Sequence, residues 1–275
     1  MYCDLHIHTT YSDSSLTPKE VVEEASRIGL TTIAITDHDT VDGIPEAIEW
    51  GKKYEIDVIP GIELSTDIGR EEVHILGYYI DWENEQFNRR LHEFKISRQK
   101  RAHLIINRFK KLGIEIDYKR VALLAGEGII GRLHIANVLK EQGVVASIKD
   151  AFSEYLNYGG LCYVEKFRLT PEEAIEMIKC VGGIPVLAHP YHNRYNNLIP
   201  KLIKVGLEGL EIYHPEHSLE IQLYYEKLAR DYRLIPTGGS DCHGTMKGGE
   251  ILLGNAKVRD EIVKRLKRFN QYNQK

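Results

Sequence analysis

The sequence has few cysteines, and none of them forms a motif. Cys3, Cys162, Cys180 and Cys242 lie far apart, with no CxxC pair. This distribution gives little support to a disulfide framework or to a thiolate zinc knuckle. A reducing cytoplasm fits this cysteine usage best.

Long apolar segments are also missing. No hydrophobic run approaches the length that spans a bilayer, and Asp4 interrupts the start of the chain before a basic and apolar leader could form. We therefore expect a soluble, unprocessed, cytoplasmic protein that does not associate with a membrane.

The sequence has no excess of positive charge. Its 36 Lys and Arg residues face 40 Asp and Glu residues, which gives a formal net charge of -4. This balance argues against a protein that works by covering nucleic acid with positive charge. The length of 275 residues, 43% of them hydrophobic, suffices for one large domain or for a barrel-sized domain with an insertion.

Strand and helix patterns alternate along most of the chain. In "MYCDLHIHT" apolar and polar residues alternate, which predicts a strand with His6 and His8 on one face. In "LTPKEVVEEASRIGL", Thr17, Pro18 and Glu20 form the start signal of a helix. Further strands are predicted at "TTIAIT", "DVIPGIEL", "EEVHILGYYI", "IPVLAH", "LEGLEIYH" and "LIPTGGSD", with helices between most of them. This alternation indicates a parallel sheet covered by helices, either open or closed as a barrel.

The alternation is interrupted twice. A short link, "STDIGR", separates the third and fourth strands, so the fourth is predicted to be antiparallel or irregular. Residues 84–160 have no strand pattern, and we interpret them as a helical insertion between two segments of the main domain, 1–83 and 161–275. A helical apolar stripe supports this reading: Phe87, Leu91, Phe94, Ala102, Ile105, Phe109 and Leu112. The basic run between Arg89 and Lys111 is interpreted first as a solvated helix face and second as a surface for phosphate-rich ligands.

Histidine and acidic residues gather at the predicted strand ends. In parallel α/β folds the carboxyl ends of the strands build the active site. The residues at or next to these ends are His6, His8, Asp13, Asp37, His38, Asp39, Glu63, His74, His189, His214, Asp241 and His243. Each of them alone has an ordinary structural explanation. So many imidazoles and carboxylates in one place would, however, destabilise the fold through desolvation and mutual repulsion unless cations neutralise them.

Metal ions would supply the missing neutralisation. Nitrogen and oxygen ligands without thiolate suit zinc, manganese or iron. The candidates are too many for one ion and, at about four to six ligands per ion, suit two or three divalent ions, with a carboxylate such as Glu63 bridging a pair. Multinuclear centres of this kind are typical of hydrolases that act on phosphate esters.

The sequence resembles the polymerase and histidinol phosphatase (PHP) superfamily. The matching motifs are "DLHIHTTYSD", "ITDHDT", "PGIELS", "HILGY", "VLAHP" and "SDCHG", spread from residue 4 to residue 244. The resemblance implies a distorted (β/α)7 barrel with a metal centre at its mouth. It assigns the first ion to His6, His8, Glu63 and Asp241, the second to His74 and His189 with Glu63 bridging, and the third to Asp13, His38 and His243. Many members have His where this chain has Asp13.

A closer similarity is to the stand-alone, TrpH-like branch of that superfamily. It includes nucleoside 3′,5′-bisphosphate phosphatases and 5′ to 3′ exoribonucleases that act on short RNA. The segments "GRLHIANVLKEQG" and "EIYHPEH" match those that supply phosphate-binding residues there, which are Arg132 and His214 in this chain. The resemblance further implies that catalysis depends on His6, His8, Glu63 and Asp241 together with His214.

The expected function is hydrolysis of a phosphate ester by a metal-activated hydroxide. The preferred substrate is a nucleoside 3′,5′-bisphosphate, with short 5′-phosphorylated oligonucleotides as further substrates. We expect no stable protein partner. Two alternatives stay open at this stage: a histidinol-phosphate phosphatase, and a metal-binding accessory module without catalytic activity.

Overall fold

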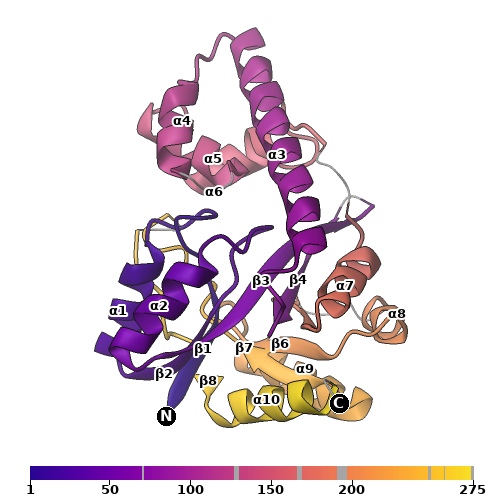
Figure 1. Cartoon of the computed structure of the whole chain (residues 1–275). Coiled ribbons are helices and arrows are strands. Elements are labelled where there is room, and N and C mark those ends of the chain that lie inside the picture. The colour runs from indigo at the N-terminus through magenta and orange to yellow at the C-terminus, as the bar shows by residue number, and fades with distance from the viewer. Residues whose placement is uncertain are drawn as a thin grey trace.

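The computed structural model describes residues 1–69, 71–126, 130–165, 169–190, 197–246, 249–256 and 258–273 (Figure 1). Its strands form one sheet in the order β7-β6-β5-β4-β3-β2-β1-β8. They are β1 (Tyr2–Ile7), β2 (Leu30–Ile35), β3 (Asp57–Ile68), β4 (Glu71–Tyr78), β5 (Ile184–Leu187), β6 (Gly209–Tyr213), β7 (Ile235–Gly238) and the short β8 (Val258–Arg259).

The sheet curls into a nearly closed barrel, because β1 returns to the chain that follows β7. Ile7 forms an isolated parallel bridge with Cys242, and the His8 N–H donates to the Cys242 carbonyl at 3.0 Å. Gly239 permits this approach, since a Cβ there would lie 2.3 Å from the His6 Cβ and backbone nitrogen. The barrel expected from the resemblance is confirmed, with the addition of β8, which pairs antiparallel with the start of β1.

Strand β4 runs antiparallel to both of its neighbours, β3 and β5, as the short link before it predicts. Its beginning therefore lies at the same end of the barrel as the carboxyl ends of the parallel strands. In this register His74 lies opposite Ser65, two residues beyond Glu63. His74, near the start of its strand, thus lies beside Glu63 at the end of the barrel where the parallel strands finish.

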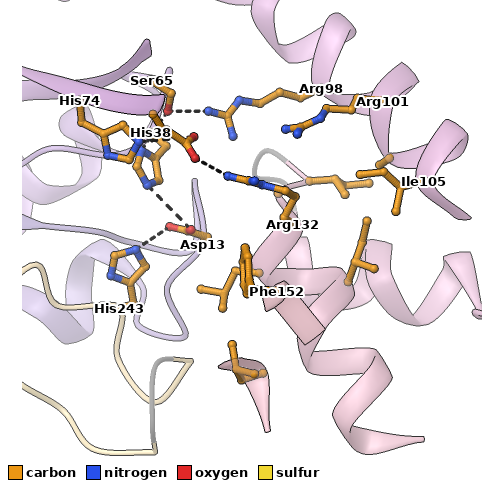
Figure 2. Close-up of a pocket in the computed structure, with 17 residues that line it drawn as sticks. Asp13, His38, Ser65, His74, Arg98, Arg101, Ile105, Arg132, Phe152 and His243 are labelled. Carbon is orange, nitrogen blue, oxygen red and sulfur yellow. Dashed lines mark hydrogen bonds and ion pairs between the residues drawn. The ribbon is translucent and has the colours of Figure 1, made fainter. Parts of the chain in front are cut away.

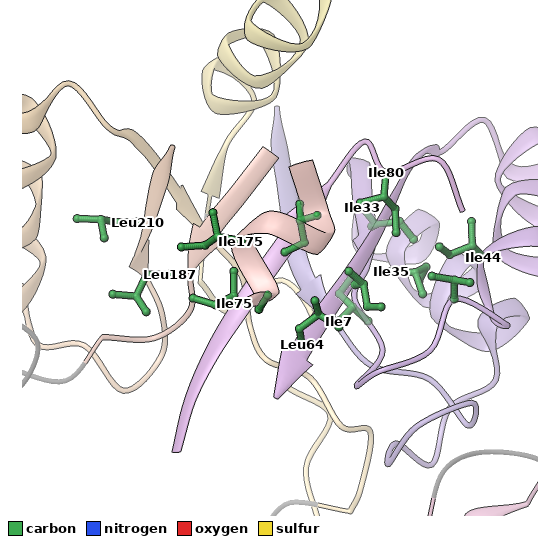
Figure 3. Packing of buried hydrophobic residues seen from close by; sticks show 14 of the residues in the cluster. Ile7, Ile33, Ile35, Ile44, Leu64, Ile75, Ile80, Ile175, Leu187 and Leu210 are labelled. Atoms are coloured by element: carbon green, nitrogen blue, oxygen red, sulfur yellow. The ribbon is translucent and has the colours of Figure 1, made fainter. Parts of the chain in front are cut away.

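Helices cover the outside of the barrel. They are α1 (Pro18–Arg27), α2 (Ile44–Tyr54), α7 (Pro171–Cys180), α8 (Ile199–Lys204), α9 (Leu219–Tyr232) and α10 (Glu261–Asn273). Helix α1 begins with the predicted capping box of Thr17 and Glu20, and α7 begins with a second one. The buried faces of α1, α2, α7, α8 and α9 pack on Ile, Leu and Val side chains of the strands (Figure 3), whereas α10 packs on a second cluster that includes Leu5 and Ile59. Among the described residues no helix is both long and apolar enough to cross a membrane.

The segment between β4 and β5 begins with helices that have a hydrophobic core of their own. Helix α3 (Glu85–Lys111) is followed by α4 (Tyr118–Ala125), α5 (Arg132–Glu141), α6 (Ile148–Ala151) and the π-helical turn η1 (Phe152–Leu156). The buried cluster of these helices also includes Cys162 and Val164. We therefore propose that the insertion extends a few residues beyond the expected end at residue 160.

Helix α3 connects the two cores. Phe87, Leu91 and Phe94 near its start pack in the barrel core, whereas Ala102, Ile105 and Phe109 pack in the core of the insertion. The predicted stripe is correct for these six residues and wrong for Leu112, which follows the last helical residue and is exposed. In Figure 1, α3 rises from the barrel and holds α4, α5 and α6 above its mouth.

Replacement of Gly239 by alanine should destabilise the barrel closure. The added methyl would overlap β1 at His6, so we expect the free energy of unfolding to fall by about 1–3 kcal/mol. Denaturant unfolding measures this change. Gly131→Ala is the control, because its Cβ would meet no atom closer than 3.8 Å. An equal stability of Gly239→Ala and the unmodified protein would contradict the proposed closure.

Candidate metal centre

Glu63 lies at the centre of a cluster of imidazole rings. Its Oε2 atom lies 3.2 Å from His6 Nε2, 3.1 Å from His8 Nε2 and 3.2 Å from His38 Nδ1. Its Oε1 atom lies 2.8 Å from His74 Nδ1 and 3.1 Å from His189 Nε2. The two oxygens of one buried carboxylate thus face two different sets of rings, which is the geometry of a bridging ligand.

Two further acidic residues complete the cluster. Asp241 Oδ1 lies 3.1 Å from His8 Nε2 and 3.4 Å from His6 Nε2. Asp13 Oδ1 lies 3.1 Å from His243 Nε2, and its Oδ2 lies 4.0 Å from His38 Nε2. Asp13 therefore reaches the same cluster.

The ligand atoms fall into three overlapping groups that could each hold an ion. Within a group the atoms lie no more than 4.8 Å apart. The groups are His6, His8, Glu63 and Asp241; His8, Asp13, His38 and His243; and His38, Glu63 and His74. They bring together the ligands expected at the first and third ions. His38 also joins the set around His74, where His189 was expected, and His189 contacts Glu63 beside it.

The donor set fits divalent cations. His6 Nε2, His8 Nε2 and Glu63 Oε2 are buried, and each makes no hydrogen bond to a described residue. A buried polar atom without a partner costs about 1–3 kcal/mol, and metal coordination would remove that cost here.

In the metal-free protein, neighbouring carboxylates favour the protonated form of two imidazole rings of this cluster. Burial opposes the charged imidazole, but Asp241 and Glu63 raise the pKa of His8 to about 9. Burial likewise opposes the charge on His74, yet Glu63 and Glu72 raise its pKa to about 9. Burial alone would raise the pKa of Glu63, but the surrounding histidines, first of all His38, hold it well below its ordinary value. The carboxylate is therefore charged at neutral pH.

A cavity of about 250 Å³ lies between this cluster and the insertion (Figure 2). Arg98 and Arg101 of α3 and Arg132 at the start of α5 point into it, opposite Asp13, His38, His74 and His243. Its far end is apolar and is lined by Ala102, Ile105, Ile130, Leu133, Ile135, Ile148 and Phe152. The cavity thus combines metal ligands, guanidinium groups and an apolar surface.

Two arginines connect the insertion to the cluster. Arg98 donates to the Asp39 carboxylate and, at 2.7 Å, to Ser65 Oγ, which lies 3.4 Å from His38 Nδ1. Arg132 donates to Glu72, whose Oε1 lies 3.5 Å from His74 Nε2. Within the basic run on α3, Arg98 and Arg101 face the cavity, while others, such as Lys100 and Lys110, are exposed as on a solvated helix face.

His214 lies outside this cavity, next to Asp241. Its Nε2 is 3.9 Å from Asp241 Oδ2, and its Nδ1 accepts the Glu216 N–H at 3.2 Å. A neutral ring accordingly carries its proton on Nε2, towards Asp241. Arg132 thus lines the cavity, whereas His214 does not.

Two further carboxylates lie behind the cluster: Asp37, which the sequence places at a strand end, and Glu211, which was not predicted. Glu211 of β6 lies 3.0 Å from His6 Nδ1 and accepts the His189 N–H at 2.8 Å. Asp37 accepts from Thr9 and Ser12, and Ser12 Oγ lies 3.4 Å from His8 Nδ1. Although burial raises the pKa of Glu211, the charge of His6 lowers it below its ordinary value. The alternation of β6, which directs Glu211 to the inside of the barrel, was the available signal.

The backbone is strained at this site. Asp39, His189 and Asp241 adopt positive φ angles of 53°, 24° and 51°, respectively. Residues other than glycine rarely adopt this region, and such strain persists where surrounding contacts hold it, often at functional sites.

Comparisons with known proteins agree with this geometry. A family model described as PHP domain matches residues 4–165. Phosphoribosyl 1,2-cyclic phosphate 1,2-diphosphodiesterase of Eggerthella lenta is 33% identical over 88% of this chain and 94% of its own. The 5′-3′ exoribonuclease Rnm of Salmonella typhimurium is 35% identical, with coverages of 87% and 84%.

Two further proteins are similar over nearly the whole chain. The 3′,5′-nucleoside bisphosphate phosphatase of Chromobacterium violaceum is 32% identical over 90% of this chain and 88% of its own. A solved structure from Bifidobacterium adolescentis, assigned as a metal-dependent phosphoesterase, is 30% identical and superposes with a TM-score of 0.87 over 96% of this chain and 94% of that one.

Metal binding should release protons at neutral pH. His8 and His74 keep their protons up to about pH 9 in the metal-free protein, whereas a ligating nitrogen must be unprotonated. Metal affinity should therefore rise as the pH increases from 6 towards about 9. Calorimetric titration with Mn²⁺ in buffers of different ionisation enthalpy measures the release. Binding without net proton release would contradict the assignment of these rings.

Proposed function

Since this chain belongs to the PHP domain family and is a metal-dependent phosphoesterase, we propose that it hydrolyses the 3′-phosphate of nucleoside 3′,5′-bisphosphates and also acts on short 5′-phosphorylated oligonucleotides. One observation carries the proposal: the candidate metal ligands face three arginines across a cavity that ends in an apolar surface. The arginines match the phosphates of a nucleotide, and the apolar surface matches its base.

We propose that the cluster holds two or three Mn, Fe or Zn ions. His6, His8, Glu63 and Asp241 hold the first ion, Glu63 with His74 and His189 the second, and Asp13, His38 and His243 the third. When bound, such ions lower the pKa of a water molecule and neutralise charge on phosphoryl oxygens. Glu63 supports this assignment because each of its oxygens faces a different set of rings.

The arginines bind the phosphates in this proposal. Arg132 lines the cavity and pairs with Glu72, which in turn contacts His74. A phosphate bound at the cluster would therefore lie within reach of the Arg132 guanidinium. Arg98, which also pairs with Asp39, and Arg101 line the same cavity. We propose that they bind a second phosphate of the same substrate, which favours a bisphosphate over a monophosphate. His214, with its proton on Nε2, is proposed to donate to a phosphoryl oxygen beside Asp241.

The rival functions fit less well. A histidinol-phosphate phosphatase would have no need of the arginines that the insertion brings to the cavity. An accessory module without activity is disfavoured, because relatives that match most of this chain are named as hydrolytic enzymes. Hydrolysis of a phosphoribosyl cyclic phosphate is a second candidate, since the Eggerthella lenta relative is named for that reaction.

Replacement of Arg132 by alanine should impair catalysis without removing metal. Loss of one phosphate-binding group of this kind costs about a hundred-fold in rate, so kcat/KM for a nucleoside 3′,5′-bisphosphate should fall by that order. Metal content, measured by plasma mass spectrometry, should stay unchanged. Arg120→Ala is the matched control, because Arg120 pairs with Glu141 on the exposed side of the insertion. Full activity of Arg132→Ala would favour histidinol phosphate as substrate.

A side-by-side assay should identify the substrate. We expect hydrolysis of a nucleoside 3′,5′-bisphosphate to exceed that of a nucleoside 5′-monophosphate, histidinol phosphate and phosphoribosyl 1,2-cyclic phosphate, with a 5′-phosphorylated RNA trimer as a further substrate. His8→Ala and Asp241→Ala should abolish every activity and lower bound metal. The highest kcat/KM for either of the two non-nucleotide substrates would refute the proposed specificity.

A further inference from the structure

Glu211 is a buried carboxylate that no proposed step uses. It lies on β6 and is completely inaccessible to solvent. It belongs to none of the three ligand groups formed by the described residues, and it does not line the cavity. Such a group is expensive to bury unless its hydrogen bonds are satisfied, so its contacts show what it stabilises.

The first contact of Glu211 is with the ring of His6. Oε1 and Oε2 lie 3.0 and 3.1 Å from His6 Nδ1. A proton on Nδ1 that is donated to this carboxylate leaves the lone pair on Nε2. That nitrogen faces Glu63 at 3.2 Å and Asp241 at 3.4 Å. Glu211 therefore selects the tautomer and the ring orientation that a ligating His6 requires.

The second contact is with the backbone of His189. The His189 N–H donates to Glu211 Oε2 at 2.8 Å, and this residue has a positive φ of 24°. A left-handed backbone at a histidine needs such contacts to persist. The result is that His189 Nε2 lies 3.1 Å from Glu63 Oε1, on the opposite oxygen from the one that His6 faces.

We propose that Glu211 is a positioning residue that couples the first and second metal positions, holding His6 for one and His189 for the other. The inference rests on the ligand assignment under the proposed function. It adds that the two positions are not independent, since one carboxylate orients a ligand of each.

The test is a double-mutant cycle on metal binding, with Zn²⁺ alone as the probe and no substrate. Calorimetric titration of the full chain with Glu211→Gln should show both of these Zn²⁺ positions weakened about ten- to hundred-fold. In a His6→Ala background, Glu211→Gln should still weaken Zn²⁺ binding at the second position, because it still affects His189. In a His189→Ala background, it should still weaken Zn²⁺ binding at the first position, because it still affects His6. An effect that disappears in either background overturns the coupling.

Two further measurements separate positioning from a general structural role. Glu211→Asp keeps the charge but shortens the side chain, so it should weaken Zn²⁺ binding as Glu211→Gln does; wild-type affinity of a folded Glu211→Asp overturns the proposal. In ¹⁵N-histidine NMR of the Zn²⁺-loaded protein, the His6 Nδ1 proton should be protected from exchange and should lose that protection in Glu211→Gln. An unchanged signal overturns it as well.

The outcomes also distinguish this inference from the ligand assignment. If the unmodified protein binds no Zn²⁺, both are wrong. If it binds Zn²⁺ and Glu211→Gln binds it with equal affinity, the assignment stands and the coupling through Glu211 is refuted.

Discussion

The arrangement of the site depends on the buried carboxylate of Glu63 and on the histidines that surround it. Glu63 is almost inaccessible to solvent, and five imidazole rings lie within 3.2 Å of its two oxygens. Asp241 and Asp13 add negative charge around them. Protons on some of the rings balance part of this charge in the metal-free protein, but several ligand atoms keep no hydrogen-bond partner among the described residues. Divalent ions would satisfy both the charge and the unpaired atoms, which is why we propose that this cluster is a metal centre and not a network of buried ion pairs.

The fold serves this arrangement in three ways. Parallel strands bring their carboxyl ends together, and the antiparallel β4 adds His74 to the same end. The close approach at Gly239 draws β7 and β1 together, so that Asp241 meets His6 and His8. Helix α3 packs in both hydrophobic cores and thereby holds Arg98 and Arg101 over the mouth of the barrel. The proposed phosphate-binding arginines are thus attached to the same barrel as the proposed metal ligands.

Much of this architecture was predictable from local patterns. The alternation in β1 places His6 and His8 on one face, and the Thr-Pro-x-Glu signals mark the starts of α1 and α7, because these features depend on neighbouring residues. Glu211 and the link from Arg98 to Asp39 and Ser65 were not predicted, since they join segments far apart in the chain. Leu112 was assigned to a buried stripe, yet α3 ends before it. Which of Arg98, Lys100 and Arg101 faces the cavity depends on how α3 is rotated against two cores, and the basic run alone does not determine that rotation.

The central claim is that Glu63 bridges metal ions at the mouth of the barrel. Crystals of the full chain grown with Mn²⁺ and measured near the manganese absorption edge test it most directly. The account predicts anomalous peaks on both sides of Glu63, each about 2.2 Å from one of its oxygens, with His6 and His8 next to one peak and His74 and His189 next to the other. A fully soaked crystal with no peak beside Glu63, or with a single peak bound to one oxygen, would contradict it.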